Sequence, residues 1–255
     1  MLAAAVTPLA LNLLFVGTVA GLMIGCVGIG GVIIVPILSL ALGVPVGTAA
    51  AAAMAGYIGT GLAGTLAFGR NGSINNTLAG LLCLGAVPGA LAGAWIVRTA
   101  DPFIVQVTIA CLAGVAGIHS LLKSRVEFPS RPQIAFGVAG AMLVGCLVGL
   151  ISAVTGTGGP LVLVPLLIWL GFPVLGAVGL GQAIQIPVAI TATGGAMFFG
   201  SLDYAIAIAL TVGLMVGCPA GAWISHHIEQ RALRTVAATV LLLTSGMMAT
   251  TLAFR

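Results

Sequence analysis

Charged side chains are almost absent from this chain. It has 255 residues with only eight basic and four acidic side chains, which is 5% of the sequence, whereas 60% of the residues are hydrophobic. A water-soluble domain carries about 25% charged residues, so a soluble fold is excluded and lipid must be the main solvent. No Asp, Glu, Lys or Arg lies well inside a hydrophobic segment, so a proton relay through a buried carboxylate has no candidate. We predict an all-α, multi-pass integral membrane protein.

Motifs for catalysis, metal binding and nucleotide binding are also missing. The sequence contains no HExxH, GxSxG or Walker motif. Its five cysteines lie singly in apolar segments without a CxxC spacing, which predicts buried packing rather than disulfides or metal ligands. The few basic residues form no face with interleaved aromatics, so nucleic acid is excluded as a partner. We expect no enzyme activity, no metal and no cofactor.

One hydrophobic pattern occurs twice in the chain, 128 residues apart. Three motifs keep this offset, and the pairs are 28–31 with 156–159, 42–45 with 170–173, and 93–96 with 221–224. Duplicated apolar halves with glycine-interrupted segments are typical of secondary transporters. We therefore predict one transmembrane domain over 1–255, built from tandem repeats at 9–122 and 133–253 and a linker at 123–132.

Each repeat contains four or five helical segments. The predicted segments are 9–27, 32–42, 46–69, 75–97 and 102–122, then 133–155, 160–170, 174–200, 204–225 and 232–253. Crossing a bilayer takes about 20 apolar residues, so 32–42 and 160–170 are too short to cross as straight helices. Both follow a glycine motif. We expect each to be either a half-helix or the second part of an interrupted helix.

The basic residues favour inverted over parallel repeats. An odd number of crossings per repeat places six basic residues on one side and two on the other, whereas parallel repeats divide them five to three. The six residues are Arg70, Lys123, Arg125, Arg131, Arg231 and Arg234. By the positive-inside rule we favour inverted repeats with a cytoplasmic linker, and parallel repeats stay open as the alternative.

The glycine motifs are the first candidate for a binding site. Their glycines are Gly28, Gly30, Gly31, Gly156, Gly158 and Gly159. Each glycine costs a helix about 1 kcal/mol relative to alanine, so both motifs predict a helix break. A helix that starts after a break offers free N–H groups and the positive end of its dipole, which can hold an anion without a basic side chain. Two such ends near the midplane would form a cradle for a small anion. The alternative is that the glycines only allow a kink or a close helix crossing.

Two glutamines extend this candidate site. Gln182 and Gln185 are three residues apart and lie on one helical face, and their counterparts in the first repeat are Met54 and Tyr57. Polar side chains inside a membrane are often functional, and amides or a phenol can hydrogen-bond an oxyanion. Interhelical hydrogen bonds that only fix the packing are the competing interpretation.

Threonines and prolines flank the breaks. Thr155 and Thr157 belong to the candidate substrate site, although Thr155, Thr157, Thr191 and Thr193 can equally bond to their own helix carbonyls. The candidate hinge or helix-breaking prolines are Pro36, Pro160 and Pro165.

The duplicated pattern of GxGG, a short apolar run with proline, and Leu-Gly-x-Pro resembles the TauE/SafE family of sulfite exporters over about residues 9–253. The resemblance implies a multi-spanning carrier of the inner or plasma membrane for small anions such as sulfite, sulfonates and related organosulfur compounds, or small carboxylates in some members. We predict a secondary transporter, specifically an exporter, that works by alternating access around a midplane site. The alternative is a channel-like facilitator for small solutes or small carboxylates. Pro160 follows the second motif directly and has no counterpart in the first, so the two breaks should differ. The substrate, direction, coupling ion and oligomeric state, including a homo-oligomer, stay open.

Overall fold

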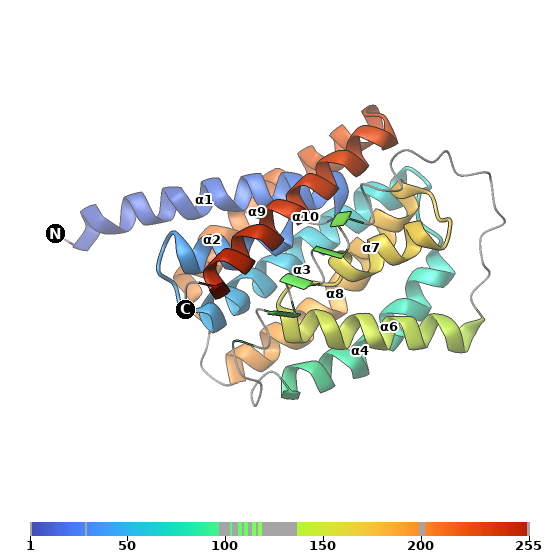
Figure 1. Ribbon diagram of the computed structural model, residues 1–255, viewed down its shortest axis with the longest axis horizontal. Helices are drawn as coiled ribbons and strands as arrows, with labels where there is room; N and C mark the ends of the chain where they lie inside the picture. The colour runs from blue at the N-terminus through green and yellow to red at the C-terminus, as the bar shows by residue number, and fades with distance from the viewer. Residues whose placement is uncertain are drawn as a thin grey trace.

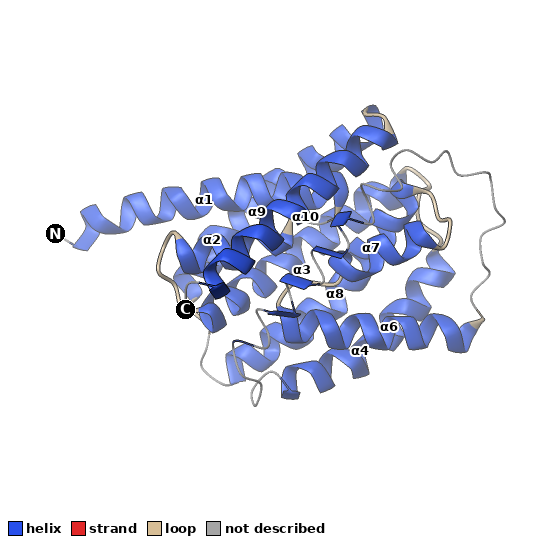
Figure 2. Ribbon diagram, viewed as in Figure 1, coloured by secondary structure: helices blue, strands red, loops and turns tan. Residues whose placement is uncertain are grey.

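Every described element of the chain is an α-helix. The computed structural model describes residues 2–28, 30–96, 137–198 and 202–253, and isolated positions between 103 and 118. Figure 2 shows helices joined by loops and no strand in these residues. The helices are α1 (Leu2–Val27), α2 (Gly31–Leu40), α3 (Val46–Arg70), α4 (Asn76–Ile96), α6 (Val138–Thr155), α7 (Pro160–Trp169), α8 (Val174–Phe198), α9 (Tyr204–His227) and α10 (Gln230–Ala253). The all-α prediction is confirmed. The predicted linker at 123–132 and most of the segment at 102–122 lie outside the described residues.

Two of the described helices, α2 and α7, are much shorter than the others. Six helices, namely α1, α3, α4, α6, α8 and α9, contain stretches long and apolar enough to cross a membrane. In contrast, α2 and α7 have 10 residues each. At 1.5 Å per residue they are about 15 Å long, roughly half of a hydrocarbon core of about 30 Å. The chain is therefore a multi-pass membrane protein with two half-length helices, close to the predicted short segments.

Each short helix folds back along the long helix that follows it. The start of α2 at Gly31 lies beside Tyr57 in the middle of α3, whose first residue, Val46, comes soon after α2 ends. Likewise, Gly159 directly before α7 lies beside Gln185 in the middle of α8. The short helices α2 and α7 therefore run antiparallel to the long helices α3 and α8 that follow them.

The directions of α3 and α8 follow from the residues that touch. Gly61 and Gly64 of α3 lie against Gln182, and Phe68, one turn later, lies against Gly179. Contacts that advance along α3 go backwards along α8, so the two helices are antiparallel. Since these helices correspond under the 128-residue offset, equivalent helices run in opposite directions. Inverted repeats require this geometry.

Stripes of glycine bring two helix pairs to backbone contact. A Cβ atom on Gly17 of α1 would collide with the carbonyl oxygen of Leu210 in α9. At the positions 128 residues away, a Cβ atom on Gly145 of α6 would collide with the carbonyl oxygen of Leu82 in α4. Small residues allow such close approach between membrane helices. Figure 1 shows α1 beside α9 and α4 beside α6 at opposite edges of the bundle. The first helix of each repeat therefore packs on a helix of the other repeat.

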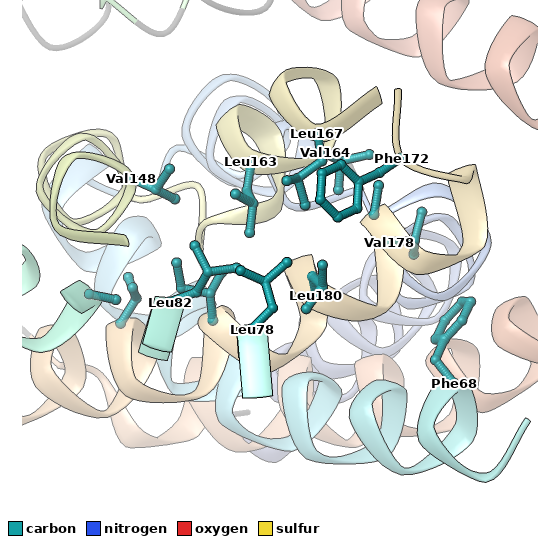
Figure 3. Close-up of a cluster of buried hydrophobic side chains, with 14 of the residues drawn as sticks. Phe68, Leu78, Leu82, Val148, Leu163, Val164, Leu167, Phe172, Val178 and Leu180 are labelled. Atoms are coloured by element: carbon teal, nitrogen blue, oxygen red, sulfur yellow. The ribbon is translucent and has the colours of Figure 1, made fainter. Parts of the chain in front are cut away.

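Two hydrophobic cores also combine helices from both halves of the chain. In the first, Leu163 and Leu167 of α7 face Leu82 of α4 and Leu180 of α8 (Figure 3). This core draws mainly on α4, α6, α7 and α8. The second draws mainly on α1, α2, α3 and α9 and includes Tyr57. Each core thus combines three helices of one predicted repeat with one of the other.

Candidate functional site

The first helix break lies between α1 and α2. Helix α1 ends at Val27, and Gly28 has φ 79°, a left-handed conformation that glycine adopts without strain. The N–H of Gly28 still donates to the carbonyl oxygen of Ile24 at 2.8 Å. Gly30 has helical dihedral angles and precedes α2. The first break therefore needs only one glycine for its backbone shape.

The second break, between α6 and α7, is bent more strongly. Gly156, Gly158 and Gly159 have φ angles of 70°, 82° and 108°. Pro160 is then the first residue of α7, where a missing N–H costs no hydrogen bond. The two breaks differ, in agreement with the expectation from Pro160. In place of the second and third left-handed glycines, the first break has helical Gly30 and Gly31.

The breaks lie at the glycines and not at the prolines that follow them. Pro36 lies inside α2 and Pro165 lies inside α7, and both helices continue through these residues. Pro36 and Pro165 therefore do not break their helices, and a hinge role for them stays a prediction. Each proline is the sixth residue of its 10-residue helix, past the N–H groups that have no intrahelical partner, so it removes one backbone hydrogen bond while the helix continues. Only Pro160 adjoins a break, as the residue that starts the new helix.

Tyr57 of α3 connects the two breaks. Its hydroxyl donates to the carbonyl oxygen of Gly31 at 2.8 Å, and its ring lies against Gly158 in the opposite break. The breaks are also close to each other directly, since a Cβ atom on Gly31 would lie 3.1 Å from the carbonyl oxygen of Thr157. Tyr57 is 1% exposed, and the described residues of both glycine motifs are buried. Two motifs 128 residues apart thus meet inside the protein, away from lipid.

The two glutamines hold α8 against the first repeat. Nε2 of Gln182 donates to the carbonyl oxygen of Ile24 in the last turn of α1, at 2.8 Å. Nε2 of Gln185 lies 2.8 Å from Oγ1 of Thr60 and 3.3 Å from the carbonyl oxygen of Tyr57, both in α3. The side-chain nitrogen of each glutamine therefore donates to a residue in the first half of the chain. This arrangement favours a positioning role over direct contact with an anion.

The hydroxyls beside the second break bond to each other. Oγ1 of Thr155 donates to the carbonyl oxygen of Ile151 at 2.8 Å, as expected for a helical threonine. Oγ1 of Thr157 lies 2.8 Å from Oγ1 of Thr155. Because Thr155 uses its hydrogen on the carbonyl, Thr157 must be the donor in this pair. Both hydroxyl hydrogens are therefore occupied in this conformation.

The free hydrogen-bond donors near the two breaks are backbone N–H groups. Neither α2 nor α7 has a side-chain cap at its N-terminus within the described parts of the chain. In the second break, the N–H groups of Thr157, Gly158 and Gly159 have no acceptor among the described residues. Successive N–H groups around left-handed residues form concave anion sites known as nests. The buried polar side chains that the structure describes are all uncharged. An anion held here would depend on backbone dipoles.

A comparison with protein families matches this chain over most of its length. A family model described as Sulfite exporter TauE/SafE matches residues 13–248, which include both breaks and both repeats. The chain belongs to the TauE/SafE family. It is therefore a multi-pass membrane transporter, embedded in a lipid bilayer, that handles a small anion. The family consists of transporters and not of enzymes. No curated protein and no solved structure matches the chain.

Other glycines predicted for the site of this TauE/SafE protein lie in packing contacts. Gly28 faces Val164 of α7 and Val178 of α8, and Gly156 faces Ala50 of α3. Gly30 packs against the last turns of α1, where a Cβ atom would lie 2.8 Å from the backbone nitrogen of Ile24. These glycines shape the breaks. Gly31 lies beside the hydroxyl of Tyr57, Gly158 lies beside the ring of Tyr57, and Gly159 lies beside Ile184 and the backbone of Gln185.

Thr60 is a buried residue of the site that was not predicted from the sequence. It is fully buried, accepts a hydrogen bond from Gln185, and lies 3.3 Å from the carbonyl oxygen of Tyr57. Thr60 follows Tyr57 by three residues on the same helical face, the spacing that linked Gln182 with Gln185. Applying that spacing to the first repeat would have identified it.

Proposed function

We propose that this TauE/SafE protein is a secondary transporter for a small oxyanion such as sulfite or a sulfonate, bound between the two helix breaks. One observation supports the proposal above the others: the start of α2 and the second break are buried together, and Tyr57 contacts both. A helix N-terminus carries about half a positive charge, so two termini near one point attract an anion. An oxyanion has several acceptor oxygens and can bind several N–H groups at once.

The electrostatics favour a small and weakly held anion. The buried polar side chains described include neither Lys nor Arg, so no full positive charge compensates the loss of hydration. Binding without a fixed cation keeps affinity moderate, and a carrier that must release its substrate needs moderate affinity. The proposed ligands are the N–H groups of Gly31, Gly158 and Gly159, with the hydroxyl of Thr157 turning toward the anion when it binds. Tyr57, Gln182 and Gln185 position the breaks.

The burial of this site supports alternating access. Thr157 is 5% exposed, and Gln185 is 2% exposed, so solvent barely reaches either side chain in this conformation. A substrate must therefore wait for a movement that opens a path. The antiparallel course of α3 and α8 supports two inverted repeats, whose equivalent movements would open the site to opposite sides of the membrane. The same burial disfavours the channel-like alternative, since a channel needs a continuous wet path.

Flux assays with the purified full-length protein in liposomes test the proposal. Sulfite, a small sulfonate and a small carboxylate are each offered with and without a pH gradient, and protein-free liposomes serve as the control. We expect saturable uptake of sulfite or the sulfonate and accelerated exchange when the same anion is present inside. Non-saturating flux without exchange would support a channel instead. Liposomes that take up none of the three anions would contradict the proposed substrate class.

A further inference from the structure

Helical threonines in this protein usually bond to their own backbone. In each of five threonines, Oγ1 donates to the carbonyl oxygen four residues earlier; they are Thr18, Thr155, Thr191, Thr211 and Thr239. This bond is the ordinary way to satisfy a hydroxyl in an apolar surrounding. Thr191 in α8 is a clear case, with a distance of 2.8 Å to the carbonyl oxygen of Pro187.

Thr65 and Thr193 depart from this rule together. Oγ1 of each is inaccessible to solvent and has no hydrogen-bond partner among the described residues. Thr193 is 8% exposed, and Thr65 is half-buried. The expectation that Thr193 bonds to its own helix is therefore wrong. A buried hydroxyl without a partner costs stability, so it needs an explanation such as a ligand or water.

The two positions are equivalent in the repeats. Thr193 follows Thr65 by 128 residues, so the same unpaired hydroxyl occurs once in α3 and once in α8. Tyr57 and Gln185 are equivalent in the same way and touch each other where α3 and α8 cross. Each threonine lies eight residues further along its helix, about 12 Å from that crossing at 1.5 Å per residue. Because α3 and α8 are antiparallel, the two threonines lie in opposite directions from the crossing, one toward each membrane surface.

The remaining unpaired polar atoms cluster near the breaks. Within the described residues they are Oγ of Ser152 and Oε1 of Gln182. Ser152 is in the last turn of α6 before the second break, and Gln182 contacts the last turn of α1 before the first break. Unpaired polar groups thus occur at the breaks and on both sides of them.

We propose that Thr65 and Thr193 are two transient binding sites for the transported oxyanion, one on each side of the central site. The inference rests on the proposed function, because the ligand is the same small oxyanion. Each hydroxyl donates to the anion as it moves between the membrane surface and the glycine breaks. Between these passages the hydroxyl has no partner, which explains why both are buried and unpaired. The path of the anion therefore follows α3 on one side and α8 on the other.

Substitution by valine, which has the shape of threonine without the hydroxyl, tests this inference. The variants are Thr65→Val and Thr193→Val, Thr191→Val is the control on the same helix, and Thr193→Ser restores the hydroxyl. The full-length variants are placed in liposomes in one checked orientation, and sulfite and sulfonate flux is measured from each side. We expect Thr65→Val to raise KM about fivefold from one side only and Thr193→Val to do so from the other side. Thr191→Val should change KM less than twofold from either side, and Thr193→Ser should behave like wild type.

A stability measurement separates a transport role from a structural one. If the hydroxyls have no partner in the resting protein, the melting temperatures of both valine variants in detergent should stay the same or rise. A lower melting temperature with a matching loss of flux would overturn the inference, as would an unchanged KM from both sides. Wild-type protein that moves neither anion would contradict the proposed function and this inference with it. Active wild type with unaffected variants would contradict only this inference.

Discussion

The side-chain nitrogen of Gln185 lies 3.3 Å from the backbone carbonyl oxygen of Tyr57, the residue 128 positions earlier in the chain. These two residues are equivalent under the 128-residue offset, so an axis relating the two predicted repeats would pass between them. On that axis the first repeat provides a phenol and the second provides an amide. The phenol bonds to Gly31 in its own repeat, whereas the amide bonds to Thr60 across the axis. The centre of the protein is therefore asymmetric although its framework is repeated.

Replacing Gln185 with leucine should loosen the α3–α8 crossing. The change removes a buried hydrogen bond to Thr60, which is worth about 1 kcal/mol. Thr60 keeps its contact with the carbonyl oxygen of Tyr57, so the protein should still fold. If Gln185 positions the breaks, KM for the transported anion should rise about fivefold, which corresponds to about 1 kcal/mol. Flux in liposomes measures this, and an unchanged KM would remove Gln185 from the site.

Replacing Tyr57 with phenylalanine separates the hydroxyl from the ring. The ring stays against Gly158, but the carbonyl oxygen of Gly31 loses the hydrogen bond from the hydroxyl, which is worth about 1 kcal/mol. The start of α2 should become less well held, so we expect a lower melting temperature and a raised KM. Tyr204→Phe is the matched control, because Tyr204 lies exposed at the start of α9. Equal effects from the two substitutions would argue against a special role for Tyr57.

The positions of the breaks could be predicted because glycine acts locally. Three glycines within four residues weaken a helix regardless of what packs around it, and the structure has breaks at Gly28 and at Gly156–Gly159. The effect of the prolines could not be predicted in this way, because a proline inside a helix can either end the helix or leave it continuous. Pro36 and Pro165 are each the sixth residue of a 10-residue helix, and both helices continue through them although each proline removes one backbone hydrogen bond.

The partners of the polar side chains could not be predicted in the same way. Gln182 bonds to Ile24, 158 residues earlier, and this contact exists only because α8 lies beside the end of α1. Nothing in the local sequence of either residue encodes that neighbour. The unpaired hydroxyl of Thr193 could not be predicted either, because Thr191, two residues earlier in the same helix, makes the ordinary bond to its own helix.

The glycine stripes give a prediction about the assembly of the repeats. A Cβ atom on Gly89 of α4 would overlap the carbonyl oxygen of Cys146, and one on Gly217 of α9 would overlap that of Thr18. Valine at either position should therefore separate a helix pair, at a cost of about 3 kcal/mol or more, because backbone cannot move aside as a side chain can. Gly80→Val is the control, since Gly80 in the same helix α4 has open space around it. Melting temperatures in detergent should fall for the first two variants and stay nearly constant for the third.

Alanine at Gly158 tests whether the second break forms the site. Its φ angle of 82° is left-handed, which costs a non-glycine residue about 1–2 kcal/mol, and the new Cβ atom would lie 2.8 Å from Cδ2 of Tyr57. Gly171→Ala is the matched control, because Gly171 has φ 91° but nothing lies within 4 Å of the Cβ position. Both variants incur similar backbone strain, whereas only the first displaces the ring that joins the breaks. We expect Gly158→Ala to insert into membranes and lose most anion flux, while Gly171→Ala keeps it. Equal loss of flux in both variants would show that backbone strain alone impairs the protein. That result would contradict the prediction that the second break forms the binding site.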